Sequence, residues 1–195
     1  MPPPKTASKS TLRDRFRAYR RGLSEDEWAE RSAAIRAQVR SLPELSAAST
    51  VHVYWPQVDH HEVDTRPLVR ALNENGATVA LPVVTAYPPA APEMEARRFP
   101  GAEQLTPNRW GIPEPATGRQ VDPDAIDVVL VPALGAGRDG HRIGHGTGYY
   151  DAFLASVHAP TVTLVYEATL VDALPAEPHD QPVDVIVTES AVVRP

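Results

Sequence analysis

A cluster of glycines that follows a short apolar run places the strongest limit on how this chain can fold. Six of the eleven glycines lie between Gly135 and Gly148, and residues 126–134 before them read IDVVLVPAL. Such an apolar run is typical of a strand that is buried on both faces. Glycine inside a regular element costs about 1 kcal/mol relative to alanine, so a cluster of glycines needs a physical reason. The segment therefore predicts a central strand followed by a specialised loop.

Strand-like and helix-like patterns alternate along the rest of the chain. Strands are expected at residues 50–55, 77–84, 94–99, 126–134, 161–166 and 183–188. Helices are expected at residues 5–23, from Ser24 onward, at 65–76 and at 149–157. Ser24 and Glu27 have the spacing of a capping box, and Gly76 is expected to end the third helix. The alternation predicts an α/β fold with a sheet that is at least partly parallel.

Composition and charge narrow the class of protein. The length of 195 residues predicts a single domain, and we expect residues 1–7 to be disordered. The absence of cysteine excludes disulfides and cysteine-ligated zinc. The chain lacks a signal-peptide pattern and a membrane-spanning apolar run, so we expect a cytoplasmic protein with no membrane partner. The net charge of −6 argues against a nucleic-acid partner, although residues 13–21 are rich in arginine.

The glycine segment lies where open α/β sheets bind ligands, after a central strand and before a helix. It contains neither a GxGxxG fingerprint nor a P-loop lysine, and no serine is present for a nucleophile elbow. Its backbone N–H groups can cradle an anion; a structural turn at the edge of the sheet is the alternative. Asp151 would repel a phosphate unless Mg²⁺ lies between them. Together with Arg142, these residues predict a nucleotide–Mg²⁺ site.

Residues 140–154, GHRIGHGTGYYDAFL, resemble the signature of the 5-formyltetrahydrofolate cyclo-ligase family, whose members are also called 5,10-methenyltetrahydrofolate synthetases. Four further segments resemble the family's other elements in the right order. They are KSTLR at 9–13, EVDT at 62–65, WGIPEP at 110–115 and LPAEPHDQPVDVIVTE at 174–189. The resemblance covers nearly the whole chain, and the conjunction is specific although no single piece is.

The resemblance implies both a fold and a reaction. The expected fold is a three-layer domain with a central, mostly parallel sheet flanked by helices, similar in layout to the sugar-phosphate isomerase and coenzyme A transferase group. The expected reaction uses ATP to phosphorylate the formyl oxygen of 5-formyltetrahydrofolate. The neighbouring nitrogen then closes the ring to give 5,10-methenyltetrahydrofolate, ADP and phosphate. The implied cofactor is Mg²⁺, and we expect the protein to be a monomer.

The resemblance also assigns roles to individual residues. Arg142 and Tyr150 are the expected catalytic residues, and Asp151 and Asp180 the expected magnesium ligands. The expected nucleotide-binding residues are Lys9, Arg13, Arg142, Gly144, His145, Gly146, Thr147, Gly148, Tyr149 and Tyr150. The expected folate-binding residues are Trp55, Glu62, Trp110 and Tyr149, with Glu62 accepting hydrogen bonds from the pterin. We also expect the proline-rich segment 87–100 to border the folate site.

Two alternatives from other functional classes stay open at this point. Thr147 and the segment GAGRDG at 135–140 depart from the family pattern. These departures leave room for a homologue that binds nucleotide or folate without turnover. The arginine-rich first helix leaves room for an RNA-associated protein, whose binding would weaken steeply with salt. Core packing is the competing interpretation for each tryptophan.

Overall fold

The apolar run after residue 125 forms the strand β7 (Val128–Pro132), which lies inside an eight-stranded sheet of the computed structural model. The structure describes residues 7–195, and within them the strand order is β13-β12-β10-β7-β1-β2-β3-β6. The five strands β12, β10, β7, β1 and β2 run parallel to one another. The three remaining strands, β13, β3 and β6, pair antiparallel at the two edges. The predicted α/β fold with a mostly parallel sheet is confirmed.

The helices and strands have the following bounds. The helices are α1 (Lys9–Arg21), α2 (Glu25–Arg40), α3 (Pro43–Ser46), α4 (Arg66–Glu74) and α5 (Tyr149–Leu154). The other strands of the main sheet are β1 (Thr50–His52), β2 (Thr78–Ala86), β3 (Glu93–Arg98), β6 (Gln120–Val121), β10 (Thr161–Leu164), β12 (Val185–Val187) and β13 (Val192–Val193). Two small sheets contain β4 (Leu105–Pro107) with β5 (Pro113–Pro115), and β8 (Gly135–Gly137) with β9 (Arg142–Ile143) and β11 (Leu170–Val171).

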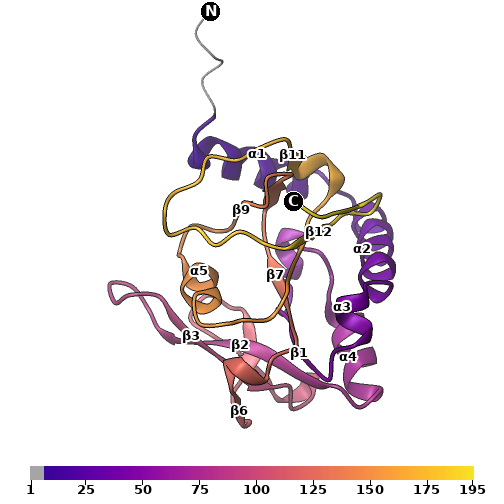
Figure 1. Ribbon diagram of the computed structural model, residues 1–195, viewed down its shortest axis with the longest axis vertical. Coiled ribbons are helices and arrows are strands. Elements are labelled where there is room, and N and C mark those ends of the chain that lie inside the picture. Colours follow the sequence, from indigo (N-terminus) through magenta and orange to yellow (C-terminus); the bar gives the residue numbers. More distant parts are fainter. Residues whose placement is uncertain (1–6) are drawn as a thin grey trace, which may run out of the picture.

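Side chains that alternate along the buried strands build a separate core on each face of the sheet. Val128 and Leu130 belong to the core that includes residues of α2, α3 and α4. Val129 and Val131 belong to the other core, which includes Phe153 of α5. Figure 1 shows α2, α3 and α4 on one side of the sheet and α5 on the other. This arrangement gives the three layers that the family resemblance implies.

Most helix boundaries agree with the sequence signals. The Ser24 hydroxyl accepts a hydrogen bond from the Glu27 amide at 3.2 Å, and the Glu27 carboxylate accepts one from the Ser24 amide at 2.9 Å, so the capping box is confirmed. Gly76 follows α4 with φ +87°, a conformation that favours glycine. Two ends differ from the expected ones. The first helix begins at Lys9, capped by Ser8, rather than at residue 5, and α5 ends at Leu154 rather than at residue 157. The predicted disorder at residues 1–7 concerns residues that, except Ala7, lie outside the described range.

The glycine segment is more regular than a loop. Its first glycines form β8, which pairs with β9 and β11 in a small sheet beyond the end of β7. A Cβ atom at Gly135 would lie 2.6 Å from the Thr169 carbonyl oxygen and would also overlap the Phe16 ring of α1. Gly135 therefore allows α1 to pack closely across this small sheet. The sequence predicted the position of the segment but missed these short strands.

No helix within residues 7–195 is long and apolar enough to cross a membrane.

His52 of β1 is buried under α5 and makes the stability of the fold depend on pH. It is 0% exposed, its ring lies 4.8 Å from that of Phe153, and neither ring nitrogen has a hydrogen-bond partner in residues 7–195. Burial lowers the pKa of His52 from 6.5 to about 3. Below pH 6.5 the unfolded chain therefore binds a proton that the folded chain does not, and stability falls as the pH falls.

We predict that His52→Leu weakens this pH dependence. Between pH 7 and pH 5 the free energy of unfolding of the unmodified protein should fall by about 2 kcal/mol more than that of the variant, at about 1.4 kcal/mol per pH unit below 6.5. Urea unfolding at the two pH values measures the difference. Equal losses in the two proteins would show that His52 does not set the acid sensitivity.

Candidate functional site

A cavity of about 470 Å³ lies at the carboxyl ends of β7, β1 and β2, where the glycine segment meets α1 and α5. All the residues that the resemblance marks as a site line this one cavity. They are Lys9, Arg13, Trp55, Glu62, Trp110, Arg142, Gly144, His145, Gly146, Thr147, Gly148, Tyr149, Tyr150, Asp151 and Asp180. They come from both ends and the middle of the chain, so the fold brings together what the sequence separates.

The glycine loop, residues 144–148, is held against α1 by arginine side chains. The Arg13 Nε donates to the Gly144 carbonyl oxygen at 3.1 Å, and an Arg17 nitrogen donates to the His145 carbonyl oxygen at 3.4 Å. Gly146 has φ +101° and Gly148 has φ +78°, which accounts for glycine at both positions. Gly144 does not have a positive φ, and a Cβ atom at this position would meet no atom within 4 Å. Its lack of a side chain instead leaves open space along the cavity wall.

Two cations of the cavity are paired with carboxylates. Lys9 Nζ donates to Asp180 at 2.6 Å and to Glu177 at 3.1 Å. Arg142, whose side chain is 5% exposed, donates to Asp151 at 3.0 Å. Burial disfavours the charged Lys9 ammonium, but its hydrogen bonds to Asp180 and Glu177 outweigh burial and raise the pKa of Lys9. Each of these two cations therefore lies against at least one carboxylate of the cavity wall.

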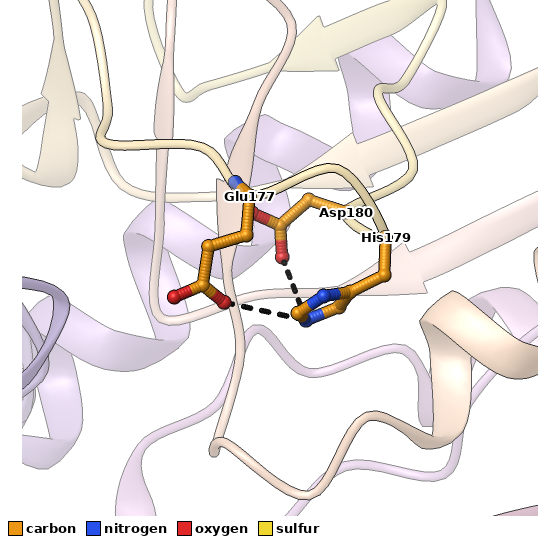
Figure 2. Close-up of side chains that lie close together, drawn as sticks. All are labelled: Glu177, His179 and Asp180. Carbon is orange, nitrogen blue, oxygen red and sulfur yellow. Dashed lines mark hydrogen bonds and ion pairs between the residues drawn. The ribbon is translucent and has the colours of Figure 1, made fainter.

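The expected pair of metal ligands, Asp151 and Asp180, lies in the cavity wall, but each carboxylate has different neighbours. Asp151 Oδ1 accepts from Arg142 and, at 3.2 Å, from the Gln181 amide. Asp180 lies with Glu177 and His179 in a group whose possible ligand atoms are all within 4.8 Å of one another. In Figure 2 the His179 ring lies next to both carboxylates. Its Nε2 is 3.3 Å from Glu177 and 3.8 Å from Asp180. Lys9 contacts both carboxylates of this group and offsets part of their negative charge.

Glu62 places a buried carboxylate in the wall of the cavity. Its side chain is 4% exposed and lies 3.6 Å from Arg20 and 4.0 Å from the His145 ring. One carboxylate oxygen, Oε2, accepts a hydrogen bond from the backbone N–H of Gln57 at 3.0 Å. Burial lowers the pKa of His145 below its usual 6.5, so this ring is neutral at pH 7. A buried carboxylate of this kind suits recognition of N–H groups on a ligand.

Aromatic side chains line the outer part of the cavity. Trp110, 43% exposed, lies 5.5 Å from Tyr149 and 4.8 Å from Tyr87 between ring centroids. The Tyr149 hydroxyl donates to the Ala86 carbonyl oxygen at 2.7 Å, which ties α5 to the end of β2. Trp55 stacks on Phe99 at 5.8 Å and packs against the core, so it has a structural contact as well as a cavity face. These rings offer flat apolar contacts to a planar ligand.

Tyr150 reaches the inner part of the cavity as a hydrogen-bond donor. Its hydroxyl is buried and has no partner within residues 7–195. Burial, together with the nearby negative charge of Glu62, raises the pKa of Tyr150 well above its usual value of 10. The hydroxyl therefore keeps its proton at neutral pH and can donate it in a hydrogen bond to a ligand oxygen.

The sequence reasoning missed several polar residues of the cavity, including Gln57, Asn108 and Glu114. Glu114 accepts hydrogen bonds from the side-chain amide of Asn108 at 2.6 Å and from the backbone N–H of Val84 at 3.3 Å. Burial raises the pKa of Glu114 above its usual value. Glu114 belongs to the segment WGIPEP, which was a signal for it, whereas nothing in the sequence indicated Gln57 or Asn108. Segment 87–100 contributes Met94 to the cavity wall.

Together, the fold and the cavity define a class: an α/β protein whose cavity combines an anion-compatible glycine loop and three cationic side chains with an aromatic wall and a buried carboxylate. Comparisons with known proteins identify the family within this class. A model of the 5-formyltetrahydrofolate cyclo-ligase family matches residues 5–189. The chain therefore belongs to the 5-formyltetrahydrofolate cyclo-ligase family, which confirms the family inferred from the motifs.

Individual relatives agree over nearly their whole lengths. The 5-formyltetrahydrofolate cyclo-ligase of Escherichia coli is 32% identical over 182 residues, which cover 91% of this chain and 98% of that protein. The one from Mycolicibacterium smegmatis is 34% identical over 180 residues and 89% of each chain. The solution structure of Aquifex aeolicus 5,10-methenyltetrahydrofolate synthetase superimposes with a TM-score of 0.82 at 33% identity, covering 95% of this chain and 92% of that one.

We predict that two glycines of the loop respond differently to substitution by alanine. Gly148→Ala forces an L-residue to φ +78° and should lower the free energy of unfolding by about 1–2 kcal/mol. Gly144→Ala meets no neighbouring atom and should change it by less than about 0.5 kcal/mol. Urea unfolding of the two variants measures both values. Equal destabilisation would show that the loop does not have the backbone geometry described here.

Proposed function

We propose that this chain is a 5-formyltetrahydrofolate cyclo-ligase, which uses ATP to convert 5-formyltetrahydrofolate to 5,10-methenyltetrahydrofolate with release of ADP and phosphate. The observation that carries the proposal is that one cavity is lined both by the glycine loop with Lys9, Arg13 and Arg142, and by Glu62 with the aromatic side chains. An enzyme that joins a phosphorylation to a ring closure needs both subsites to face one reacting centre.

The chemistry requires positioning more than acid–base catalysis. The formyl oxygen is a poor leaving group, and transfer of the terminal phosphoryl group of ATP makes it a good one. The neighbouring nitrogen then attacks the activated carbon, the carbon–oxygen bond breaks, phosphate leaves and the nitrogen loses its proton. Because the attack is intramolecular, a cavity that holds the near-attack geometry removes several kcal/mol of the barrier. Charge neutralisation at the phosphates is the main remaining task.

The nucleotide half of the cavity fits a triphosphate. Gly144 leaves the backbone open to close approach, since a Cβ there would meet no atom within 4 Å. Lys9, Arg13 and Arg142 supply positive charge, and Thr147 and Gly148 complete the loop. α5 is only six residues long, so the loop amides and the cations, rather than the helix dipole, would supply most of the attraction. Arg142 and the Tyr150 hydroxyl would face the phosphoryl group in transfer.

The acidic residues fit a divalent cation in the same half. Asp151 and Asp180 offer the carboxylate oxygens that Mg²⁺ prefers. Both carboxylates contact cations that the phosphates would attract, Arg142 and Lys9 respectively. Phosphates that replace the carboxylates on these cations would free Asp151 and Asp180 to serve as ligands. When bound, Mg²⁺ would offset the negative charge on the phosphates.

The folate half depends on hydrogen bonding and stacking. Glu62 would accept hydrogen bonds from the N–H edge of the reduced pterin, which suits a carboxylate acceptor. Trp55, Trp110 and Tyr149 would flank the flat parts of the substrate. Segment 87–100, with Met94 in the cavity wall, would border this subsite. We also propose that residues 1–195 act as a single domain and as a cytoplasmic monomer.

Turnover tests the proposed function directly. We predict that the purified protein, incubated with 5-formyltetrahydrofolate and Mg-ATP, produces the near-ultraviolet absorbance of the methenyl product, with ADP formed in equal amount. Omission of ATP is the control and should abolish the signal. Binding of both ligands without any rise in absorbance would instead identify a non-catalytic homologue.

The metal assignment has its own test. We predict that Asp151→Asn lowers Mg²⁺-dependent turnover at least 100-fold, because an amide is a poorer Mg²⁺ ligand than a carboxylate. Circular dichroism checks that the variant is folded, and Asp172→Asn, which alters an exposed aspartate, is the matched control. Activity equal to that of the control would refute a role for Asp151 in holding the cation.

A further inference from the structure

Arg20 is a buried cation behind the folate half of the cavity. It lies in the last turn of α1, is 2% exposed and does not itself line the cavity. One of its terminal nitrogens, Nη2, donates to the Ala133 carbonyl oxygen just after β7. Its Nε and Nη1 have no hydrogen-bond partner within residues 7–195. A buried guanidinium is costly unless an opposite charge lies close to it.

That opposite charge is the Glu62 carboxylate. Arg20 Nη1 lies 3.6 Å from Glu62 Oε1, and both side chains are at most 4% exposed. Among residues 7–195, the other basic side chain within 4.0 Å of Glu62 is His145 of the glycine loop, whose pKa burial lowers. Three tyrosine hydroxyls also face this carboxylate. Those of Tyr54 and Tyr166 donate to backbone carbonyls, and that of Tyr150 has no partner within the described residues. Arg20 is therefore the cation that balances Glu62 in the part of the chain that the structure describes.

Arg20 and Glu62 are close enough to attract each other but do not form a hydrogen bond. At 3.6 Å, Nη1 is too far from Oε1 for a hydrogen bond, yet close enough for a strong electrostatic attraction. The backbone N–H of Gln57 donates a hydrogen bond to Oε2 at 3.0 Å. No group within residues 7–195 donates one to Oε1. The ion pair thus stabilises the ionised carboxylate without using the acceptor sites of Oε1.

We propose that Arg20 is a positioning residue of the folate subsite: its guanidinium faces the Glu62 carboxylate, holds it in place and leaves Oε1 free to accept hydrogen bonds from the pterin. This inference rests on the proposed function and adds to it a residue outside the cavity wall. Without Arg20, the buried Glu62 carboxylate would lose the cation beside it, and a buried charge without a partner is costly. The carboxylate would no longer be held in position for the pterin, and the substrate would bind more weakly.

A purely structural role is the competing explanation, because Arg20 also ties α1 to Ala133. A structural role would affect both halves of the cavity, since α1 carries Lys9 and Arg13 as well. A role through Glu62 affects the folate half alone. The dissociation constants of the two substrates, measured separately by calorimetry, distinguish these explanations and do not depend on turnover.

The test compares Arg20→Met, Arg20→Lys and Arg21→Met. Arg21→Met is the matched control, because it removes an exposed guanidinium from the next position of the same helix. Arg20→Met should weaken binding of 5-formyltetrahydrofolate more than tenfold and leave the affinity for Mg-ATP within twofold, whereas Arg20→Lys should recover most of the loss. An equal loss of affinity for 5-formyltetrahydrofolate and for Mg-ATP would overturn the inference. So would an unchanged folate affinity in a folded Arg20→Met protein.

A double-mutant cycle gives a second, independent reading. Glu62→Gln should weaken folate binding, and adding Arg20→Met to it should cause no further loss, because Arg20 acts through Glu62. The double variant removes both buried charges, so it also serves if Arg20→Met alone does not fold. A further tenfold loss in the double variant would overturn the inference, as would unchanged binding in Glu62→Gln. Folate binding without turnover in the unmodified protein would instead refute the proposed function and leave these comparisons valid.

Discussion

The burial of β7 on both faces is the constraint on which the rest of the structure depends. Val128, Val129, Leu130 and Val131 are all 0% exposed, and alternate side chains belong to different cores. A strand of this kind needs parallel neighbours and helices on both sides. Its carboxyl end then opens between the layers, and the chain must continue there with residues small enough to turn. The glycine segment is that continuation, so the position of the cavity follows from the strand.

Charge is distributed over the cavity in matched pairs. Lys9 with Asp180, Arg142 with Asp151 and Arg20 with Glu62 each set a cation against a carboxylate from another part of the sequence. The first two pairs lie in the cavity wall, where a ligand can exchange partners with them. In the third pair Arg20 lies behind the wall, and its Nη1 is 3.6 Å from Glu62 Oε1, too far for a hydrogen bond. We propose that the same kind of pair serves two purposes, which depend on whether a ligand can reach the cation and on the distance within the pair.

The sequence predicted the features that depend on local patterns and on the family motifs. The β7 run, the Ser24–Glu27 capping box and the motif residues that line the cavity are in this group. It could not predict that Gly135–Gly137 would form a strand, because that depends on pairing with β9 and β11, which come later in the chain. Nor could it indicate Arg20 or Gln57, since their importance comes from where Glu62 lies after folding. Features set by tertiary neighbours, rather than by spacing along the chain, were the ones missed.

The Arg13 side chain both adds positive charge to the cavity wall and holds the glycine loop by a hydrogen bond. It lies in the cavity wall as a cation, and its Nε also fixes the Gly144 carbonyl oxygen at the start of the glycine loop. A lysine at this position would keep the charge but could not present the same fixed fork of donors. A neutral replacement would therefore lose both the charge and the contact with the loop, whereas lysine would lose only the fork of donors. Any replacement would leave at least one of these two tasks to another residue.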